Sequence, residues 1–118
     1  MSNNSIEQLG TNLRDGSTTS LEIVERALEA SDRLDPILGT YLCRFDETAL
    51  ETAARADNEL QSGLDRGPLH GIPLGIKDII STDEGPTTAQ SLVQDPSWGD
   101  QGDGPLIRRL RESGAVVM

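Results

Sequence analysis

The sequence predicts an α/β protein in which N-terminal helices precede the first strands of a mixed sheet flanked by helices. Apolar residues recur at helical spacing through residues 1–62, which indicates helices that each bury one face. Residues 72–76 and 115–118 are instead short, continuous apolar runs, as in parallel strands that are covered on both faces. We therefore divide the chain into a helical part, 1–62, and the start of an α/β core, 67–118.

The first two helices are predicted from apolar spacing and from the residues at their ends. One runs over residues 5–14 and stops before Gly16. The next begins at a capping box, in which the Thr19 hydroxyl accepts a hydrogen bond from the Glu22 amide and the Glu22 carboxylate reaches back. We expect the pair Asp35-Pro36 to end this helix, because a residue before proline is pushed out of the helical region.

A third helix is expected to be capped by Asp46 and to extend to about residue 62. Small and aliphatic residues at helical spacing form its inner face: Ala49, Leu50, Ala53, Ala56 and Leu60. Residues 37–45, which precede it, are short and apolar, and are either extended or an irregular connector.

The C-terminal half reads as strand, loop, helix and strand, the order of a βαβ-like unit. Residues 81–104 are rich in Gly, Asp, Ser, Thr and Pro and are predicted to form a long loop. A helix should begin at Pro105, since proline is favoured at the first helical position. Domains usually end at exposed, polar positions, so a last strand at 115–118 predicts the N-terminal piece of a larger α/β protein. Three residues of the helix are expected to face inward: Leu106, Ile107 and Leu110.

Charge and composition exclude several classes of protein. The chain has 20 acidic and 10 basic residues and a formal net charge of −10. That sign argues against a surface that follows nucleic-acid phosphates or an anionic membrane. No stretch approaches the ~20 apolar residues of a transmembrane helix. The N-terminus lacks an apolar signal segment, and the single cysteine, Cys43, cannot form an internal disulfide, so we expect a cytoplasmic protein.

Nine of the ten basic residues are arginines, and the tenth is Lys77. An acidic excess in which arginine replaces lysine favours a halophile-like protein from a salt-adapted cytosol, where net charge maintains solubility. An ordinary acidic protein with an arginine bias is the alternative.

Lys77 is the main catalytic candidate. It follows the predicted strand 72–76, at the carboxyl end where open α/β sheets place ligands. Neighbouring isoleucines, Ile79 among them, would desolvate its ammonium and favour a neutral amine that can act as a general base. Arginine cannot lose its proton, so a lysine kept here alone indicates proton transfer. The alternative is a lysine that points into solvent, and Asp78 would act as its counter-charge.

Other candidates carry less chemistry. His70 lies in a Gly/Pro turn with no histidine or cysteine at metal-ligand spacing, and Cys43 is interpreted as a small buried hydrophobe. The hydroxyls of Thr88 and Ser91 could bind a substrate or a catalytic neighbour, although solvated loop residues are the simpler interpretation. No GxSxG motif, Ser/His/Asp set, metal site or cofactor motif is present.

The segment GPLHGIPLGIKD at residues 67–78 resembles the conserved lysine segment of the amidase signature family. The segment TTAQS at 87–91 is similar to the Thr-Thr stretch that follows it there, and residues 103–117 are similar to the next helix and strand. Residues 17–38 also resemble that family's helical start. The chain has Gly104 where alanine is commoner in the family, and Gln90 where glycine is common.

The resemblance implies an incomplete amidase-signature fold and a serine hydrolase with a Ser–cis-Ser–Lys triad that acts on linear amides. Lys77 matches the family lysine, which acts through a bridging serine to activate the nucleophilic serine. Asp78, Thr88 and Ser91 are expected to support it. Both serines and the oxyanion loop would follow this sequence, so the 118-residue chain should be inactive alone. The resemblance implies no cofactor.

Two other functions stay open. The same family includes the A subunit of tRNA-dependent amidotransferases, which releases ammonia from glutamine; the segment 87–91 looks more like that of the general amidases. A homodimer and the other amidotransferase subunits are the partners to consider. From another class, the chain could be a non-catalytic binding or adaptor fragment that has kept an amidase-like start.

Overall fold

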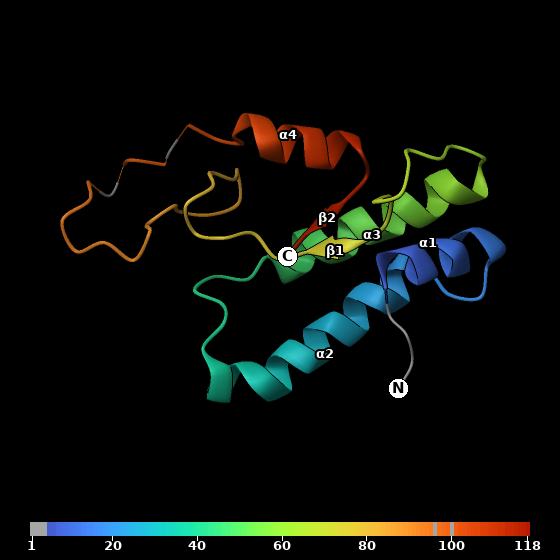
Figure 1. The fold of residues 1–118 in the computed structure, drawn as a ribbon, viewed down its shortest axis with the longest axis horizontal. Coiled ribbons are helices and arrows are strands. Elements are labelled where there is room, and N and C mark those ends of the chain that lie inside the picture. The colour runs from blue at the N-terminus through green and yellow to red at the C-terminus, as the bar shows by residue number, and fades with distance from the viewer. Residues whose placement is uncertain (1–4, 96, 100) are drawn as a thin grey trace.

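The computed structural model describes residues 5–95, 97–99 and 101–118. Its fold is α/β, as predicted, with a small parallel sheet in which Pro73 pairs with Val116 and Leu74 with Val117 (Figure 1). None of the described helices is long and apolar enough to cross a membrane. The elements in chain order are α1 (Ile6–Asp15), α2 (Ser20–Leu38), α3 (Asp46–Gln61), β1 (Pro73–Leu74), α4 (Pro105–Glu112) and β2 (Val116–Val117).

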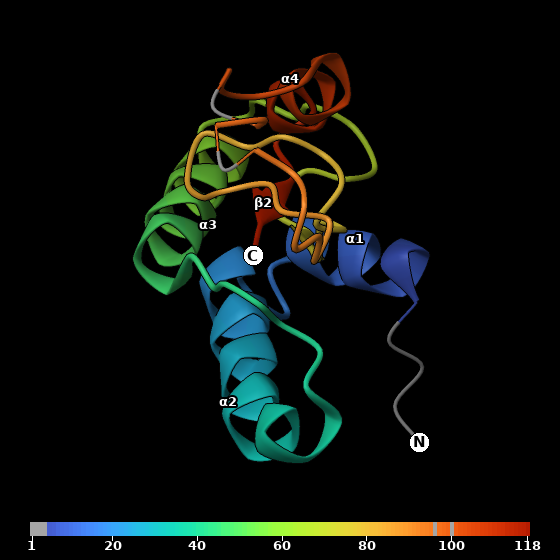
Figure 2. The same ribbon diagram turned by 90° about the vertical axis from the view of Figure 1, so that its left-hand side faces the viewer.

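The strand pair lies between α4 and α2, with α3 along one side, as the two perpendicular views show (Figures 1 and 2). Small residues make this arrangement compact, because Ala49 and Ala53 of α3 are fully buried against Val24 of α2. Val116 and Met118 complete this cluster. The inner face predicted for the third helix is therefore confirmed.

A second buried cluster joins α1 and α2 to the start of β1. Leu13, Ile23 and Ile72 form it, and Leu9, Leu60 and Leu74 pack around them. The fully buried hydroxyl of Ser20, at the first residue of α2, donates to the carbonyl of Gly71 at 2.7 Å. The turn that enters β1 is thus attached to the N-terminus of α2.

The prediction that Asp35-Pro36 ends the second helix was wrong. Helix α2 continues to Leu38 and ends at Gly39, whose positive φ of 60° allows its amide to donate to the Asp35 carbonyl at 2.7 Å. The Asp35 carboxylate accepts two further amides, from Thr40 at 2.5 Å and Tyr41 at 3.0 Å. Pro36 stands in the last turn, where these cap bonds outweigh the local preference of the residue before proline.

Asp46 does not cap the third helix. The N-cap is Phe45, which makes no side-chain cap bond, and Asp46 is the first residue of α3. The Asp46 carboxylate instead accepts two hydrogen bonds from Arg44, at 2.7 and 3.0 Å, and Arg44 also pairs with Asp32 of α2 at 2.5 Å. Because the carboxylate is held by Arg44, the helix starts one residue earlier than a capping aspartate would allow.

The strands are shorter than the apolar runs that predicted them. β1 comprises two half-buried residues of the expected 72–76, whereas β2 is buried on both faces. Within 81–104, the described residues contain neither helix nor strand, in agreement with the predicted long loop. On α4, Ile107 is buried as expected, but Leu106 is 51% exposed and does not face inward.

Candidate active site

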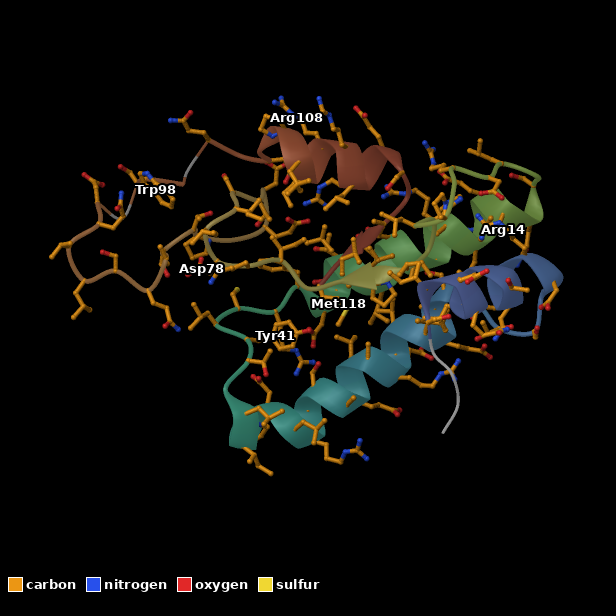
Figure 3. All side chains as sticks on the ribbon, viewed as in Figure 1. Arg14, Tyr41, Asp78, Trp98, Arg108 and Met118 are labelled. Carbon is orange, nitrogen blue, oxygen red and sulfur yellow. The ribbon has the colours of Figure 1, made fainter. Side chains whose placement is uncertain are left out.

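A pocket of about 510 Å³ lies beyond the carboxyl end of β1. Three stretches of chain line it: the connector 40–45, the turn 76–82 and the loop segment 86–90, together with Met118. Figure 3 labels Tyr41, Asp78 and Met118, which come from different elements around this pocket. The pocket therefore occupies the edge of the sheet at which α/β proteins bind ligands.

Lys77 lines this pocket and lies three residues beyond the end of β1. Its side chain is exposed, and Ile79 beside it is 51% exposed. The neighbouring isoleucines therefore do not provide the desolvated surroundings that the sequence predicts for the ammonium. The backbone here forms a tight turn, in which the Lys77 carbonyl accepts the amides of Ile79 at 2.7 Å and Ile80 at 3.0 Å.

Asp78 connects the lysine turn to the long loop. Its Oδ1 accepts the Thr88 amide at 2.9 Å, and its Oδ2 accepts the Thr88 hydroxyl. The Asp78 carbonyl also accepts the Ala89 amide at 2.8 Å. Hydrogen bonds to the ionised form, first that of the Thr88 hydroxyl, hold the pKa of the Asp78 carboxyl below its ordinary value. Asp78 is therefore a charged acceptor for the loop rather than a counter-ion in contact with Lys77.

The loop bends sharply directly after Thr88. Ala89 and Gln90 have positive φ angles of 49° and 50°, a conformation that L-residues other than glycine adopt at a cost. The Gln90 amide donates to the Thr88 hydroxyl oxygen at 3.1 Å, and Gln90 lines the pocket. Glycine, which the resemblance makes common at position 90, suits this backbone better than glutamine.

Of the four predicted site residues, the structure brings three to the pocket: Lys77, Asp78 and Thr88. Ser91 does not line it. Its hydroxyl oxygen accepts the amides of Val93 at 3.3 Å and Gln94 at 3.1 Å, so Ser91 organises the next turn of the loop.

Sequence reasoning missed the wall opposite the lysine. Tyr41, Cys43 and Phe45 line the pocket from the connector between α2 and α3. Cys43 is exposed, so its interpretation as a buried hydrophobe was wrong. The apolar character of 37–45 was the available signal, but nothing in it indicated which side chains would face the lysine turn.

Parallel strands, a ligand-sized pocket at their carboxyl edge and a primary amine on its rim define an α/β protein with a lysine-bearing site of enzyme type. The sequence profile described as Amidase matches residues 22–118. The chain therefore belongs to the amidase family.

Individual relatives agree with this assignment. AmiD of Mycobacterium tuberculosis, a protein named as an amidase, is 37% identical over 106 residues, which are 90% of this chain and 22% of AmiD. A second relative, from Chloroflexus aurantiacus, is the glutamyl-tRNA(Gln) amidotransferase protein that forms the A subunit of that enzyme. It is 36% identical over 103 residues, 87% of this chain and 21% of the relative.

Among solved structures, the peptide amidase of Stenotrophomonas maltophilia superimposes with a TM-score of 0.88 at 34% identity. The match covers 99% of this chain and 24% of that enzyme. The chain thus spans between a fifth and a quarter of the length of the relatives it matches.

Proposed function

We propose that the protein containing this chain hydrolyses linear amides through a Ser–cis-Ser–Lys triad, and that Lys77 is the proton-transfer residue. The observation that carries the proposal is the position of Lys77: an exposed primary amine on the rim of a pocket at the carboxyl edge of the sheet, within the stretch that matches the family. An exposed amine can be reached by groups that arrive from the downstream sequence.

In the proposed mechanism, the neutral Lys77 amine accepts a proton from a bridging serine, which accepts the proton of the nucleophilic serine. The nucleophile attacks the amide carbonyl, and the amine product leaves as an acyl-enzyme forms. Water then releases the acid and regenerates the serine. Both serines belong to the sequence beyond residue 118, so the chain alone supplies one member of the triad and is inactive.

We assign supporting roles to Asp78, Thr88 and Ser91. The two contacts between Asp78 and Thr88 attach the loop to the residue next to Lys77, which restricts the lysine backbone. Ser91 acts at one remove, by organising the turn that follows.

Further parts of the proposal concern the whole protein. Residues 1–118 are the N-terminal part of one amidase domain, the substrate is a small linear amide, and the protein works in a salt-adapted cytoplasm without a cofactor. A homodimer is tested by measuring the mass of the purified protein in solution.

The test is amide hydrolysis by the full-length protein, followed as ammonia release from a panel of linear amides. Lys77→Ala should abolish turnover, and Lys77→Arg should be almost as damaging because a guanidinium does not accept a proton. Arg108→Ala, which removes an exposed cation of α4, is the matched control and should leave turnover unchanged. A Lys77→Arg enzyme with a near-normal rate would exclude the proton-transfer role.

A second candidate is the A subunit of a tRNA-dependent amidotransferase, favoured by the 36% identity to the relative from Chloroflexus aurantiacus. It predicts that glutamine is hydrolysed in preference to the other amides and that the protein co-purifies with further subunits. A non-catalytic adaptor predicts no turnover of any amide by a folded protein.

A further inference from the structure

His70 is completely buried although it lies in the turn before β1. Its Nδ1 accepts the backbone amide of Arg66 at 3.1 Å, and its Nε2 lies 2.9 Å from Oε2 of Glu59 on α3. Both ring nitrogens therefore have a partner of fixed identity. The mechanism proposed above does not use this residue.

These partners define the protonation of the ring. A backbone amide can only donate, so Nδ1 must carry the lone pair, and the single ring proton is on Nε2, from which it is donated to Glu59. Glu59 is also held by the Arg66 guanidinium, at 2.7 and 2.8 Å. The hydrogen bonds from that guanidinium are the main reason that the pKa of Glu59 is lowered to about 2, so the carboxylate is always available as an acceptor. The imidazole is thus neutral and held in one tautomer.

The ring also contacts the turn that enters β2. A Cβ atom on Gly114 would lie 2.3 Å from Cδ2 of His70, and Gly114 has a positive φ of 77°. Its carbonyl accepts the Gly71 amide at 2.9 Å. His70 therefore joins three parts of the chain: α3, the turn before β1 and the turn before β2.

The strand pair has little else to fix its register. The ladder consists of two residue pairs, flanked by bonds from the Val116 amide to the Ile72 carbonyl at 2.9 Å and from the Met118 amide to the Leu74 carbonyl at 3.0 Å. A slip of one residue in a strand sends every side chain to the opposite face. Lys77 follows three residues after this short strand, so its direction depends on the register of the strand.

We propose that His70 is a positioning residue, which as a neutral Nε2–H imidazole fixes the register of β1 and thereby the position of Lys77. The inference rests on the proposed role of Lys77, but the bonding of the ring can be tested without activity.

The first test observes the tautomer. In the full-length protein labelled with ¹⁵N-histidine, long-range ¹⁵N–¹H correlation spectra report which ring nitrogen carries the proton, and the signals lost in His70→Asn identify this ring. A protonated Nε2 with an unprotonated Nδ1 is the expected result. An Nδ1–H tautomer or a doubly protonated ring at neutral pH would overturn the proposal, whatever the protein's activity proves to be.

The second test separates the two bonds of the ring by mutation. His70→Asn keeps an acceptor near the position of Nδ1, His70→Gln keeps a donor near that of Nε2, and His70→Ala keeps neither. With about tenfold expected for each bond, kcat should fall about 100-fold in His70→Ala and about tenfold in each conservative variant, with KM within about twofold. Folded His70→Ala protein with kcat within about twofold of the parent would contradict the proposal.

The third test reaches the ring from its neighbour and covers the case in which His70→Ala does not fold. Gly114→Ala places a methyl group against the imidazole. Gly16→Ala introduces the same substitution at a similar φ of 79°, where no atom lies within 4 Å of the new Cβ, and is therefore a matched control for backbone strain. Gly114→Ala should lower kcat at least tenfold more than Gly16→Ala, and equal effects of the two substitutions would overturn the proposal.

Discussion

The Thr88 side chain and backbone both donate to one carboxylate, that of Asp78, which is the residue after the candidate catalytic lysine. Two donors from a single loop residue fix the loop more firmly than either would alone, since one holds the backbone and the other the rotamer. The consequence is a loop whose position and that of the lysine turn are coupled.

Thr88→Val should uncouple them. Valine has the shape of threonine but removes the hydroxyl that donates to Asp78 and accepts the Gln90 amide. Losing these bonds should cost about 1–2 kcal/mol of local stability and lower kcat of the full-length protein about tenfold. Hydrogen exchange of the amides of 88–91 and steady-state kinetics measure the two effects. Thr48→Val, at an exposed position of α3, is the control, and equal effects of both variants would contradict this role of Thr88.

Acid should destabilise the fold through Glu59 and Asp65. The pKa of each carboxyl is lowered to about 2, chiefly by hydrogen bonds from Arg66 and Arg14 respectively. A carboxyl with a lowered pKa in the folded state contributes stability above its unfolded pKa, and this is lost as the pH falls through the folded value. Urea midpoints should therefore decrease from about pH 5 towards pH 2.

Glu59→Gln should flatten that pH dependence, because the variant has one fewer carboxylate to protonate in the ion pair. Glu47→Gln, which alters an exposed carboxylate of the same helix, should leave the slope of the urea midpoint against pH unchanged. If Glu59→Gln and the parent protein show parallel curves, the ion pair with Arg66 does not contribute to stability.

Gln90→Gly should stabilise the protein. Glutamine at a φ of 50° carries a steric cost that glycine does not, and relief of about 1 kcal/mol is expected before the entropy of the unfolded glycine is subtracted. Gln94→Gly, in the same loop, gains no such relief and should be neutral or destabilising. Chemical denaturation of both variants tests this, and a loss of stability in Gln90→Gly would show that the loop is not strained there.

Arg111 should be the most sensitive arginine of α4. It donates to Asp103 at 2.5 Å and to Glu84 at 2.6 and 2.7 Å, and both carboxylates are largely buried. Removing the guanidinium leaves two buried charges unpaired, so Arg111→Ala should cost about 3 kcal/mol.

Arg111→Lys should recover only part of that loss, because an ammonium cannot reproduce the planar arrangement of donors. Arg109→Ala, on the exposed side of the same helix, should change stability by less than about 0.5 kcal/mol. Denaturant midpoints for the three variants provide the comparison, and similar values for Arg109→Ala and Arg111→Ala would refute the argument.

The helices were predictable because their signals are local. The capping box of Thr19 and Glu22 is present as expected, and the alanines of α3 lie in the core. Where the prediction failed, a partner distant in sequence or a cap bond intervened. Asp46 is held by Arg44, whose guanidinium also reaches Asp32 of α2, and a carboxylate engaged in this way does not act as a cap.

The candidate site was predictable in one dimension only. Lys77 could be selected because it is the single lysine of the chain, and Thr88 because it lies in a conspicuous loop. Their separation in space was not encoded in either segment. His70 was interpreted as an ordinary turn residue, because its burial depends on Glu59 and Gly114, which come from other elements.

The pairing of β1 with β2 has a kinetic consequence. Leu74 meets Val117 only after the entire loop 81–104 and α4 have been placed, so the ladder closes a long segment of chain for very few bonds. Such non-local contacts form slowly, because the loop entropy is lost before the contacts compensate for it. On the ribosome, Lys77 therefore emerges well before the strand that aligns it, and the site must assemble after the helices, as a late event in folding.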